Sequence, residues 1–353
     1  MNWRALWTLV VAAAVVLVSS WACGGGGQPQ EGASPEATVT PWAVVATARI
    51  LKTTDGGSTW TIQTPDSARY LASIDFPVDA ATGYAVGWGG TIFKTADGGN
   101  SWVAQPGGAP ALIDAQFPLD TATGYAVGLN GSIVKTTDGG SNWVALTSGT
   151  SQDLWSVDFP VDATTGYAVG EGGRILKTTD GGSTWVSQAP GTEAYYLFSV
   201  DFPVDALTGY AVGRSGIILK TTDGGGSWLP LDSGTTRDLW SVQFPQDTAT
   251  GYAVGDGGTI LKTTNGGSSW VALTSGTTQD LWSVDFPLDA TTGYAAGRSG
   301  TILKTTDGGN RWVPLGSATS LDIRSVQFPV DAVTGYAVAE GSTAPGQSGN
   351  GGS

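Results

Sequence analysis

The chain has 353 residues, a formal net charge of −14, 54 glycines, 15 tryptophans and no histidine. The negative charge disfavours contact with nucleic acid or with an anionic membrane surface, so we expect neither as a direct partner. Without histidine the chain lacks the commonest general base and transition-metal ligand, and its single cysteine cannot form an intrachain disulfide or a thiolate metal cluster. We therefore expect no cofactor and no bound metal.

Residues 1–22 have the pattern of a signal peptide. Arg4 precedes an apolar stretch, residues 5–18, that is too short for a comfortable transmembrane helix, and Ser20 and Ala22 are small residues of the kind found before a cleavage site. The position of Cys23 resembles a bacterial lipobox. This predicts an exported lipoprotein at the periplasmic or outer cell surface, or a secreted protein if Cys23 is not lipidated, with the lipid as its only attachment to a membrane.

Two segments flank the repeated part of the chain. Residues 23–41 are rich in Gly, Pro and Glu and have no hydrophobic period, and residues 341–353 are similar. These compositions predict a flexible tether and a disordered tail.

Residues 42–340 consist of one repeated unit. Its central aspartate, replaced once by asparagine, recurs every 41 to 43 residues, at Asp55, Asp97, Asp138, Asp180, Asp223, Asn265 and Asp307. This is the period of a four-stranded propeller blade. In the unit at residues 154–188 we predict strand A as LWSVDF, strand B as GYAVG, strand C as RILKT and strand D as STWVSQ, each bounded by turn-forming residues.

The number of strands predicts how the fold closes. Strands A, C and D each occur seven times, whereas strand B occurs eight times, first at residues 42–44 and last at residues 336–338. The last strand A has no C and D after it, so the strands at residues 50–62 must complete its blade. We predict an all-β, monomeric, seven-bladed β-propeller closed by pairing of its N- and C-terminal strands, and the pattern leaves open which copy of B takes part.

The segments TTDGGSTW, TADGGNSW and their equivalents match the Asp-box, S/T-x-D-x-G-x-x-W, also called the bacterial neuraminidase repeat. We interpret the aspartate as a turn-forming residue, because Asn265 replaces it once. A ring of catalytic or calcium-binding acids is the alternative. With GYAVG ahead of the box, the unit resembles the photosystem II stability/assembly factor family of cyanobacteria and chloroplasts. The resemblance implies a seven-bladed, non-enzymatic assembly factor that acts in photosynthesis on the lumenal side of thylakoids.

Strand direction predicts where a partner would bind. The A–B and C–D turns share one face, and the B–C turns and D–A loops share the other, where the repeats differ most. Candidate binding residues there are aromatic or carry guanidinium groups, the types enriched in binding hot spots: Trp88, Tyr195, Tyr196, Arg214, Arg237 and Arg298. The alternative is that they are ordinary solvated surface. The lysine that recurs in every strand C is either a functional cationic ring or, in the simpler interpretation, a blade-stabilising group.

These features favour a scaffold that binds one or more proteins at the cell envelope. A lectin that stacks a glycan on Trp88 and the loop aromatics is one alternative. A sialidase-type glycoside hydrolase is another, and it would need an arginine triad, a Tyr–Glu pair and an acidic acid/base. Glu193 and Tyr195 are the best available pair, but no triad motif is recognisable. The similarity of the blades also favours a scaffold, because catalysis needs several blades to supply different residues.

Overall fold

The computed structural model describes residues 46–63, 70–107, 110–188 and 196–342. All of them belong to the second of two compact units, Val44–Ser353. The predicted signal peptide, Cys23, the tether and all but two residues of the predicted tail lie outside the described residues, as do Glu193 and Tyr195. No helix in the described ranges is both long and apolar enough to cross a bilayer.

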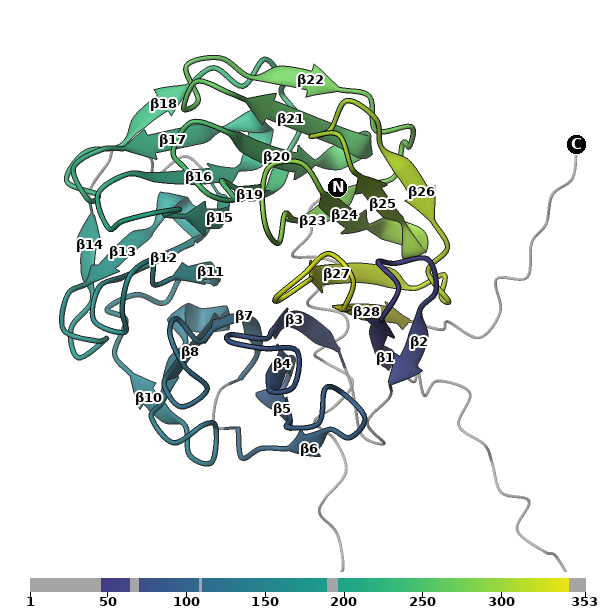
Figure 1. Cartoon of the computed structure of the whole chain (residues 1–353). Coiled ribbons are helices and arrows are strands. Elements are labelled where there is room, and N and C mark those ends of the chain that lie inside the picture. The colour runs from purple at the N-terminus through teal and green to yellow at the C-terminus, as the bar shows by residue number, and fades with distance from the viewer. Residues whose placement is uncertain (1–45, 64–69, 108–109, 189–195, 343–353) are drawn as a thin grey trace, which may run out of the picture. The chain divides into compact units, whose positions relative to one another are not determined.

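The described residues form seven antiparallel sheets of four strands, arranged as the blades of a closed β-propeller (Figure 1). Blades 1 to 3 contain β3 (Leu71–Asp75), β4 (Gly83–Gly87), β5 (Thr91–Thr95) and β6 (Val103–Ala104); β7 (Leu112–Gln116), β8 (Gly124–Gly128), β9 (Ile133–Thr136) and β10 (Val144–Leu146); and β11 (Leu154–Asp158), β12 (Gly166–Gly170), β13 (Ile175–Thr178) and β14 (Val186–Gln188). Blades 4 to 6 contain β15 (Leu197–Asp201), β16 (Gly209–Gly213), β17 (Ile218–Thr221) and β18 (Leu229–Leu231); β19 (Leu239–Gln243), β20 (Gly251–Gly255), β21 (Thr259–Thr263) and β22 (Val271–Leu273); and β23 (Leu281–Asp285), β24 (Gly293–Gly297), β25 (Ile302–Thr305) and β26 (Val313–Leu315). Short 3-10 turns link strands B and C in blades 2 to 6: η1 (Leu129–Gly131), η2 (Glu171–Gly173), η3 (Arg214–Gly216), η4 (Asp256–Gly258) and η5 (Arg298–Gly300).

Blade 7 joins the two ends of the chain. It contains β27 (Asp322–Gln327) and β28 (Gly335–Ser342) from the C-terminal end, and β1 (Ala46–Thr53) and β2 (Thr61–Gln63) from the N-terminal end. β1 and β28 pair over eight residues, from Ala46 opposite Ser342 to Thr53 opposite Gly335. The predicted closure is confirmed, and the copy of strand B at residues 336–338 is the one in the closing blade. β28 also extends two residues beyond the predicted end of the propeller at residue 340.

Side chains from neighbouring blades form one repeated contact around the ring. The buried ring of Tyr84 in strand B stacks on Phe117 of the next blade, with centroids 3.7 Å apart, and Trp143 meets the same phenylalanine edge-on. The Tyr84 hydroxyl donates to the Thr121 carbonyl oxygen over 2.7 Å. Lys94 Nζ donates to the Gly139 carbonyl oxygen over 2.8 Å, and all seven strand C lysines make the equivalent bond. These bonds agree with the blade-stabilising interpretation of the lysines.

A second ring of contacts lines the inner strands. Each strand A is a sheet edge, whose free N–H groups need acceptors. The backbone N–H of Phe117 donates to Asp75 Oδ2 of the preceding blade over 2.8 Å, and every other blade junction has the same bond. The accepting positions, in chain order, are Asp75, Gln116, Asp158, Asp201, Gln243, Asp285 and Gln327. Each glutamine also donates from its amide to the aspartate of the next blade.

Burial changes the acidity of these aspartates. It raises the pKa of Asp75 and of Asp285 to about 7, and that of Asp158 to about 6. Burial, together with the negative charge of Asp158 beside it, raises the pKa of Asp201 well above its usual range. Between about pH 4 and pH 7 the folded protein therefore holds protons that the unfolded chain has released.

We expect the melting temperature to fall by several degrees as the pH rises from about 5 to about 8, because the free energy of unfolding decreases while the buried carboxyls ionise. This prediction is tested by measuring thermal unfolding, monitored by tryptophan fluorescence, at several pH values between about 5 and about 8. The double substitution Asp75→Gln, Asp285→Gln should reduce the slope, since glutamine already accepts the same N–H bond in three blades. Asp289→Asn, at an exposed aspartate, is the control. An equal slope in the double variant would contradict the assignment.

Candidate functional site

Hydrogen bonds between loops define two faces of the propeller. Within blade 2 the C–D turn contacts the A–B loop, through Gly139 N–H and the Ala122 carbonyl, and the B–C turn contacts the residue before strand A, through Leu129 N–H and the Ala111 carbonyl. The first set of loops forms the Asp-box face. The second forms what we call the arginine face, because Arg214, Arg237 and Arg298 lie on it. This is the arrangement of loops that strand direction predicts.

On the Asp-box face each aspartate is used within its own turn. Asp180 Oδ1 accepts the Thr184 N–H and the Thr178 hydroxyl, both at 2.9 Å, and Oδ2 accepts the Thr184 hydroxyl at 2.7 Å. Asn265 keeps this pattern: its Oδ1 accepts the Ser269 N–H and its Nδ2 donates to the Ser269 hydroxyl. Gly181 and Gly182 have φ angles of 69° and 85°, in the left-handed region that favours glycine. Hydrogen bonds from the side chain four residues later lower the pKa of Asp55, Asp97 and Asp223 to about 2.

Two substitutions at Asp180 test its role in the turn. We expect Asp180→Asn to leave the melting temperature nearly unchanged, because the amide can reproduce the bonds that Asn265 makes. Asp180→Ala should lower it by a few degrees, since the Thr184 N–H and hydroxyl lose their acceptor. Thermal unfolding with and without calcium makes the measurement. Calcium-dependent stability that Asp180→Asn abolishes would instead favour a metal-binding role.

On the arginine face, one group of polar residues spans blades 3 and 4. The Tyr196 hydroxyl donates to Glu171 Oε1 at 3.2 Å, so the D–A loop before blade 4 contacts the B–C turn of blade 3. The guanidinium of Arg214 lies over the Tyr196 ring, 5.4 Å from its centroid. Glu171 is buried whereas Arg214 is exposed, so the cation of this group faces solvent and the carboxylate does not.

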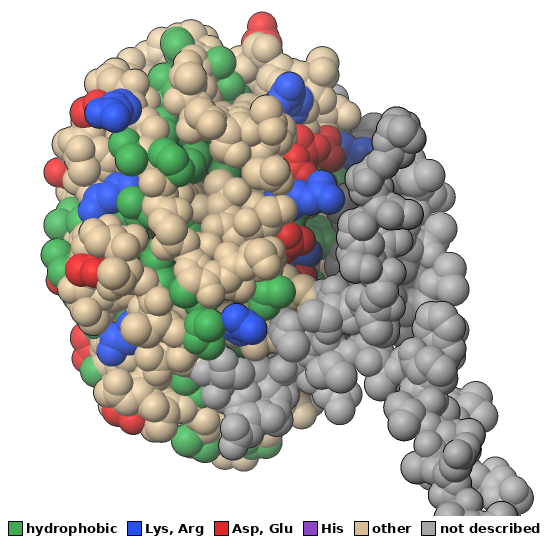
Figure 2. Space-filling model, turned by 90° about the vertical axis from the view of Figure 1, so that its right-hand side faces the viewer, with side chains coloured by type: hydrophobic (Ala, Val, Ile, Leu, Met, Phe, Trp, Pro, Cys, Tyr) green, Lys and Arg blue, Asp and Glu red, His purple; other side chains and the backbone are tan. Residues whose placement is uncertain are grey.

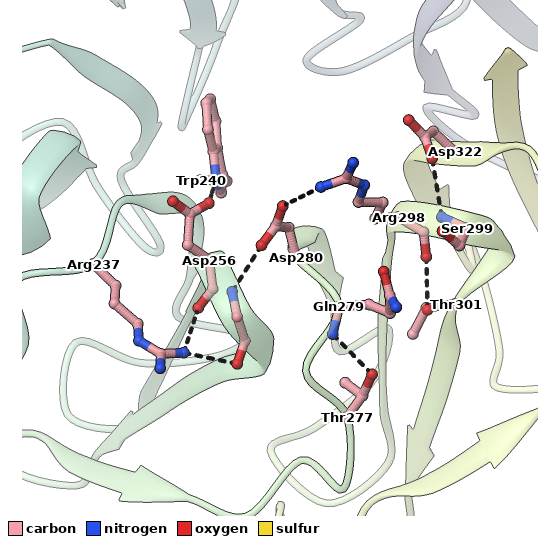
Figure 3. A network of polar contacts seen from close by, with 11 residues as sticks. Arg237, Trp240, Asp256, Thr277, Gln279, Asp280, Arg298, Ser299, Thr301 and Asp322 are labelled. Carbon is pink, nitrogen blue, oxygen red and sulfur yellow. Dashed lines mark hydrogen bonds and ion pairs between the residues drawn. The ribbon is translucent and has the colours of Figure 1, made fainter. Parts of the chain in front are cut away.

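A second group connects blades 5, 6 and 7 (Figure 3). Arg237 Nη1 donates to the carbonyl oxygens of Gly257 at 2.8 Å and Asp256 at 3.2 Å, which fixes its guanidinium against the B–C turn. Trp240 Nε1 donates to Asp256 Oδ1 at 2.6 Å. Burial raises the pKa of Asp256. The side chain of Asp256 is thus used within its own blade.

Asp280 bridges the B–C turns of blades 5 and 6 in the same network. Its Oδ1 accepts the Gly257 N–H at 2.8 Å, and its Oδ2 lies 3.6 Å from Arg298 Nη1 (Figure 3). The side chain of Arg298 is 60% exposed and that of Asp280 only 28%. Equivalent aspartates accept the second N–H of the B–C turn in the preceding blade: Asp153 from Asn130, Asp238 from Ser215, and Asp322 from Ser299.

Blades 1 and 2 carry a different set of side chains on this face. The rings of Tyr70 and Trp88 lie 5.9 Å apart, and Trp88 forms an isolated β-bridge with Ala111. The Leu129 N–H donates to the Ala111 carbonyl oxygen, so Tyr70, Trp88, Ala111 and Leu129 form one continuous series of contacts. Trp88 and Leu129 are partly exposed. The structure therefore places Trp88 among apolar neighbours, apart from the arginines with which the sequence grouped it.

One position in the inner strands, strand A of each blade, is aromatic in four successive blades. The position after the first residue of strand A is Trp155, Phe198, Trp240 and Trp282 in blades 3 to 6. Phe198 and Trp240 stack with centroids 4.2 Å apart. In blade 7 the position is Arg324, which lies over the Trp282 ring and bonds to Glu340 over 2.5 Å.

The remaining surface offers little enclosure. A groove of about 790 Å³ lies beside Arg237, lined also by Ser233 and Thr277, and a similar groove of about 510 Å³ lies beside Asn130 in blade 2. Figure 2 shows the propeller from the side, with charged side chains in small groups on a surface that is mostly backbone and uncharged residues. Of the six candidate residues, the structure links Tyr196 to Arg214 directly and places Arg237 and Arg298 in one network. Trp88 lies elsewhere on the face, and Tyr195 is outside the described residues.

Comparisons with known proteins agree with this fold. The chain matches the family model of photosynthesis system II assembly factor YCF48 over residues 36–151, 141–235 and 227–322. YCF48 from Cyanidioschyzon merolae is 20% identical, with a TM-score of 0.62, over 78% of this chain and 97% of that one. A structure of YCF48 bound to D1 peptide is 18% identical, with a TM-score of 0.62, over 84% and 95%.

A more distant enzyme shares the architecture. An ancestral GH74 enzyme is 14% identical, with a TM-score of 0.64, over 82% of this chain and 45% of that one. At such identities the solved structures agree with this chain in fold alone. A comparison with curated proteins gave no significant match.

Proposed function

Because the chain belongs to the photosynthesis system II assembly factor YCF48 family, we propose that it is a non-enzymatic scaffold that holds a partner protein on its arginine face. The observation that carries this proposal is the set of exposed guanidinium groups at positions where the blades differ. Contacts within the fold account for the positions that all blades share. Arg214 and Arg298 point their cations toward solvent, and arginine is enriched in protein-binding hot spots.

The relative that is bound to a D1 peptide supports a protein segment as the kind of partner. We further propose that the protein acts outside the cytoplasm, after removal of residues 1–22 and lipidation of Cys23. β1 begins and β28 ends at the edge of the arginine face. An anchor at Cys23 would keep the protein close to membrane-associated partners.

Affinity capture from the native cell envelope tests the scaffold. The mature propeller is compared with the triple variant Trp88→Ala, Arg214→Ala, Arg298→Ala and with the control Arg311→Ala, which removes an exposed arginine from the Asp-box face. We expect the triple variant to lose a specific protein that the wild type and the control both retain. All three substitutions are at partly or fully exposed residues, and equal melting temperatures would show that the fold is intact. Capture of glycans alone would favour the lectin alternative.

One contact bears on the glycoside hydrolase alternative. Tyr196 and Glu171 form the type of pair that sialidases use, although Glu193 and Tyr195 were the pair expected from the sequence. Among the described residues, two of the arginines on this face are already engaged, Arg237 by backbone carbonyls and Arg298 by Asp280.

We therefore expect no turnover of a fluorogenic sialoside above the uncatalysed rate. The assay is run with the wild type and with Tyr196→Phe, which keeps the ring under Arg214 but removes the hydroxyl. Hydrolysis by the wild type that disappears in Tyr196→Phe would overturn the scaffold proposal in favour of an enzyme.

A further inference from the structure

The A–B loops carry exposed aliphatic residues on the Asp-box face. The residue two positions after the phenylalanine of the junction contact is Val or Leu in six of the seven blades. Strands A surround the centre of the propeller in Figure 1, so the loops that follow them encircle its axis. We call these residues, which are 42% to 60% exposed, the aliphatic ring: Val78, Leu119, Val161, Val204, Leu288 and Val330.

Equivalent positions of the aliphatic ring lie close together in neighbouring blades. In blade 5 the position is Gln246, and its side-chain amide donates to the carbonyl oxygen of Leu288 in blade 6. One side chain thus reaches from one ring position to the next. A continuous group of exposed apolar side chains is typical of an interaction surface, whereas single exposed ones are ordinary.

The fold does not require an aliphatic residue at these positions. A proline precedes each one and an aspartate follows it. In blade 2 Asp120 Oδ1 accepts the N–H groups of Ala122 and Thr123 at 2.8 and 2.7 Å, and the aspartates of the other six blades accept the equivalent pair. The same loop forms in blade 5, where the ring position is the polar Gln246. Bonds made by the neighbouring aspartate therefore hold the aliphatic side chains at the surface.

Carboxylates border the aliphatic ring and outnumber the cations of this face. Its loops carry thirteen aspartates, seven beside the ring positions and six in the Asp-boxes, against the seven strand C lysines and Arg311. The lysines are only partly exposed, since each Nζ donates to a glycine carbonyl oxygen of the next blade, as Lys94 does. Backbone N–H bonds lower the pKa of Asp79 and of Asp289, so both stay ionised at neutral pH. The face as a whole attracts positive charge.

We propose that the aliphatic ring and its acidic border bind a basic amphipathic segment of a partner protein, with aliphatic side chains on the ring and lysine or arginine side chains on the surrounding aspartates. An apolar centre within a polar border is the usual anatomy of a protein interface. This second surface lies opposite the arginine face, so it goes beyond the proposed scaffold function and does not rest on it.

Charge selects the occupant of this surface. A second copy of the chain would present the same negative face, and an anionic membrane would be repelled. The terminal segments of the sequence are not basic either, since residues 1–45 contain one arginine and two glutamates and residues 343–353 contain no charged residue. A basic segment of another protein is the occupant that fits both the aliphatic ring and the aspartates around it.

Three synthetic peptides provide the probe. The first has a central Leu/Val stretch with lysines at both ends. The second replaces the Leu and Val residues with serine, and the third replaces the lysines with glutamate. We expect the wild type to bind the first peptide at least about tenfold more tightly than either of the others, in calorimetry or fluorescence anisotropy at several salt concentrations.

Substitutions in three adjacent blades test the aliphatic ring. The variant Val78→Ser, Leu119→Ser, Val161→Ser should bind the first peptide about tenfold or more weakly, with an unchanged salt dependence, because apolar contacts are lost and no charge is altered. The matched control has the same kind of substitution on the outer strands of the same blades, at residues that are 58% to 62% exposed: Val103→Ser, Val144→Ser, Val186→Ser. This control should bind like the wild type.

The acidic border is tested by the variant Asp79→Asn, Asp120→Asn, Asp162→Asn. Asparagine keeps an oxygen that can accept the loop N–H groups, so the loops are preserved while three negative charges are lost. We expect weaker binding of the first peptide and a flatter salt dependence. The control changes the total charge equally in the D–A loops of the arginine face, at aspartates whose Oδ1 also accepts a backbone N–H: Asp153→Asn, Asp232→Asn, Asp238→Asn. It should bind like the wild type.

Equal affinity for the three peptides, or equal losses in the loop variants and their controls, would overturn the proposal. Two other occupants would also overturn it. A dimer in sedimentation that the serine variant of the ring abolishes would assign the surface to a second copy, and binding to phosphatidylcholine vesicles that the same variant abolishes would assign it to a membrane. The scaffold proposal fails separately, because its capture experiment alters the opposite face. Equal melting temperatures of variants and controls exclude unfolding as the cause of any loss.

Discussion

Every blade of this propeller depends on its two neighbours for the completion of its hydrogen bonds. The inner edge of a blade has unpaired N–H groups, and the preceding blade supplies the acceptor, as Gln327 does for Phe76 where the chain ends meet. The same junction has the Tyr336 hydroxyl on the Ala80 carbonyl and Lys52 on the Gly98 carbonyl. The junction between blades 7 and 1 is therefore chemically equivalent to the others, and within blade 7 the pairing of β1 with β28 leaves neither strand with an unpaired edge.

This dependence also explains the unusual aspartates of the inner ring. A glutamine accepts an N–H from the following blade and also donates its amide to the aspartate of that blade, whereas an ionised aspartate can only accept. A ring of seven positions cannot alternate the two residue types throughout. The irregularity falls between Asp158 and Asp201, where Asp201 receives no amide from the preceding blade and burial raises its pKa well above the usual range. At this junction two aspartates are adjacent, and burial disfavours the ionised form of Asp201.

The fold could be predicted because the period of the repeat and the number of strands in each unit can be read directly from the sequence. The sequence could not choose between the copies of strand B at residues 42–44 and 336–338, since that choice depends on pairing with β1 over eight residues. Strand direction predicted the face that carries Arg214, Arg237 and Arg298. It did not predict that Asp280 joins the B–C turn of blade 5 to Arg298 of blade 6, because that contact crosses a blade junction. A signal was present: Asp precedes leucine at the start of strand A in blades 3, 5 and 6.

Some positions have the same residue in every blade, and others differ between blades. This separation limits which residues can change as the protein adapts to a partner. The tyrosine, phenylalanine and lysine side chains are committed to the junctions and the Asp-box side chains to their own turns, and a substitution at the junctions would disturb the closed ring. The B–C turn residues on the arginine face, such as Arg214 and Leu129, lie outside those repeated contacts. A binding surface can therefore differ from blade to blade while the propeller stays nearly symmetric. The side chains of the arginine face therefore differ between blades, although the backbone of the blades is nearly the same.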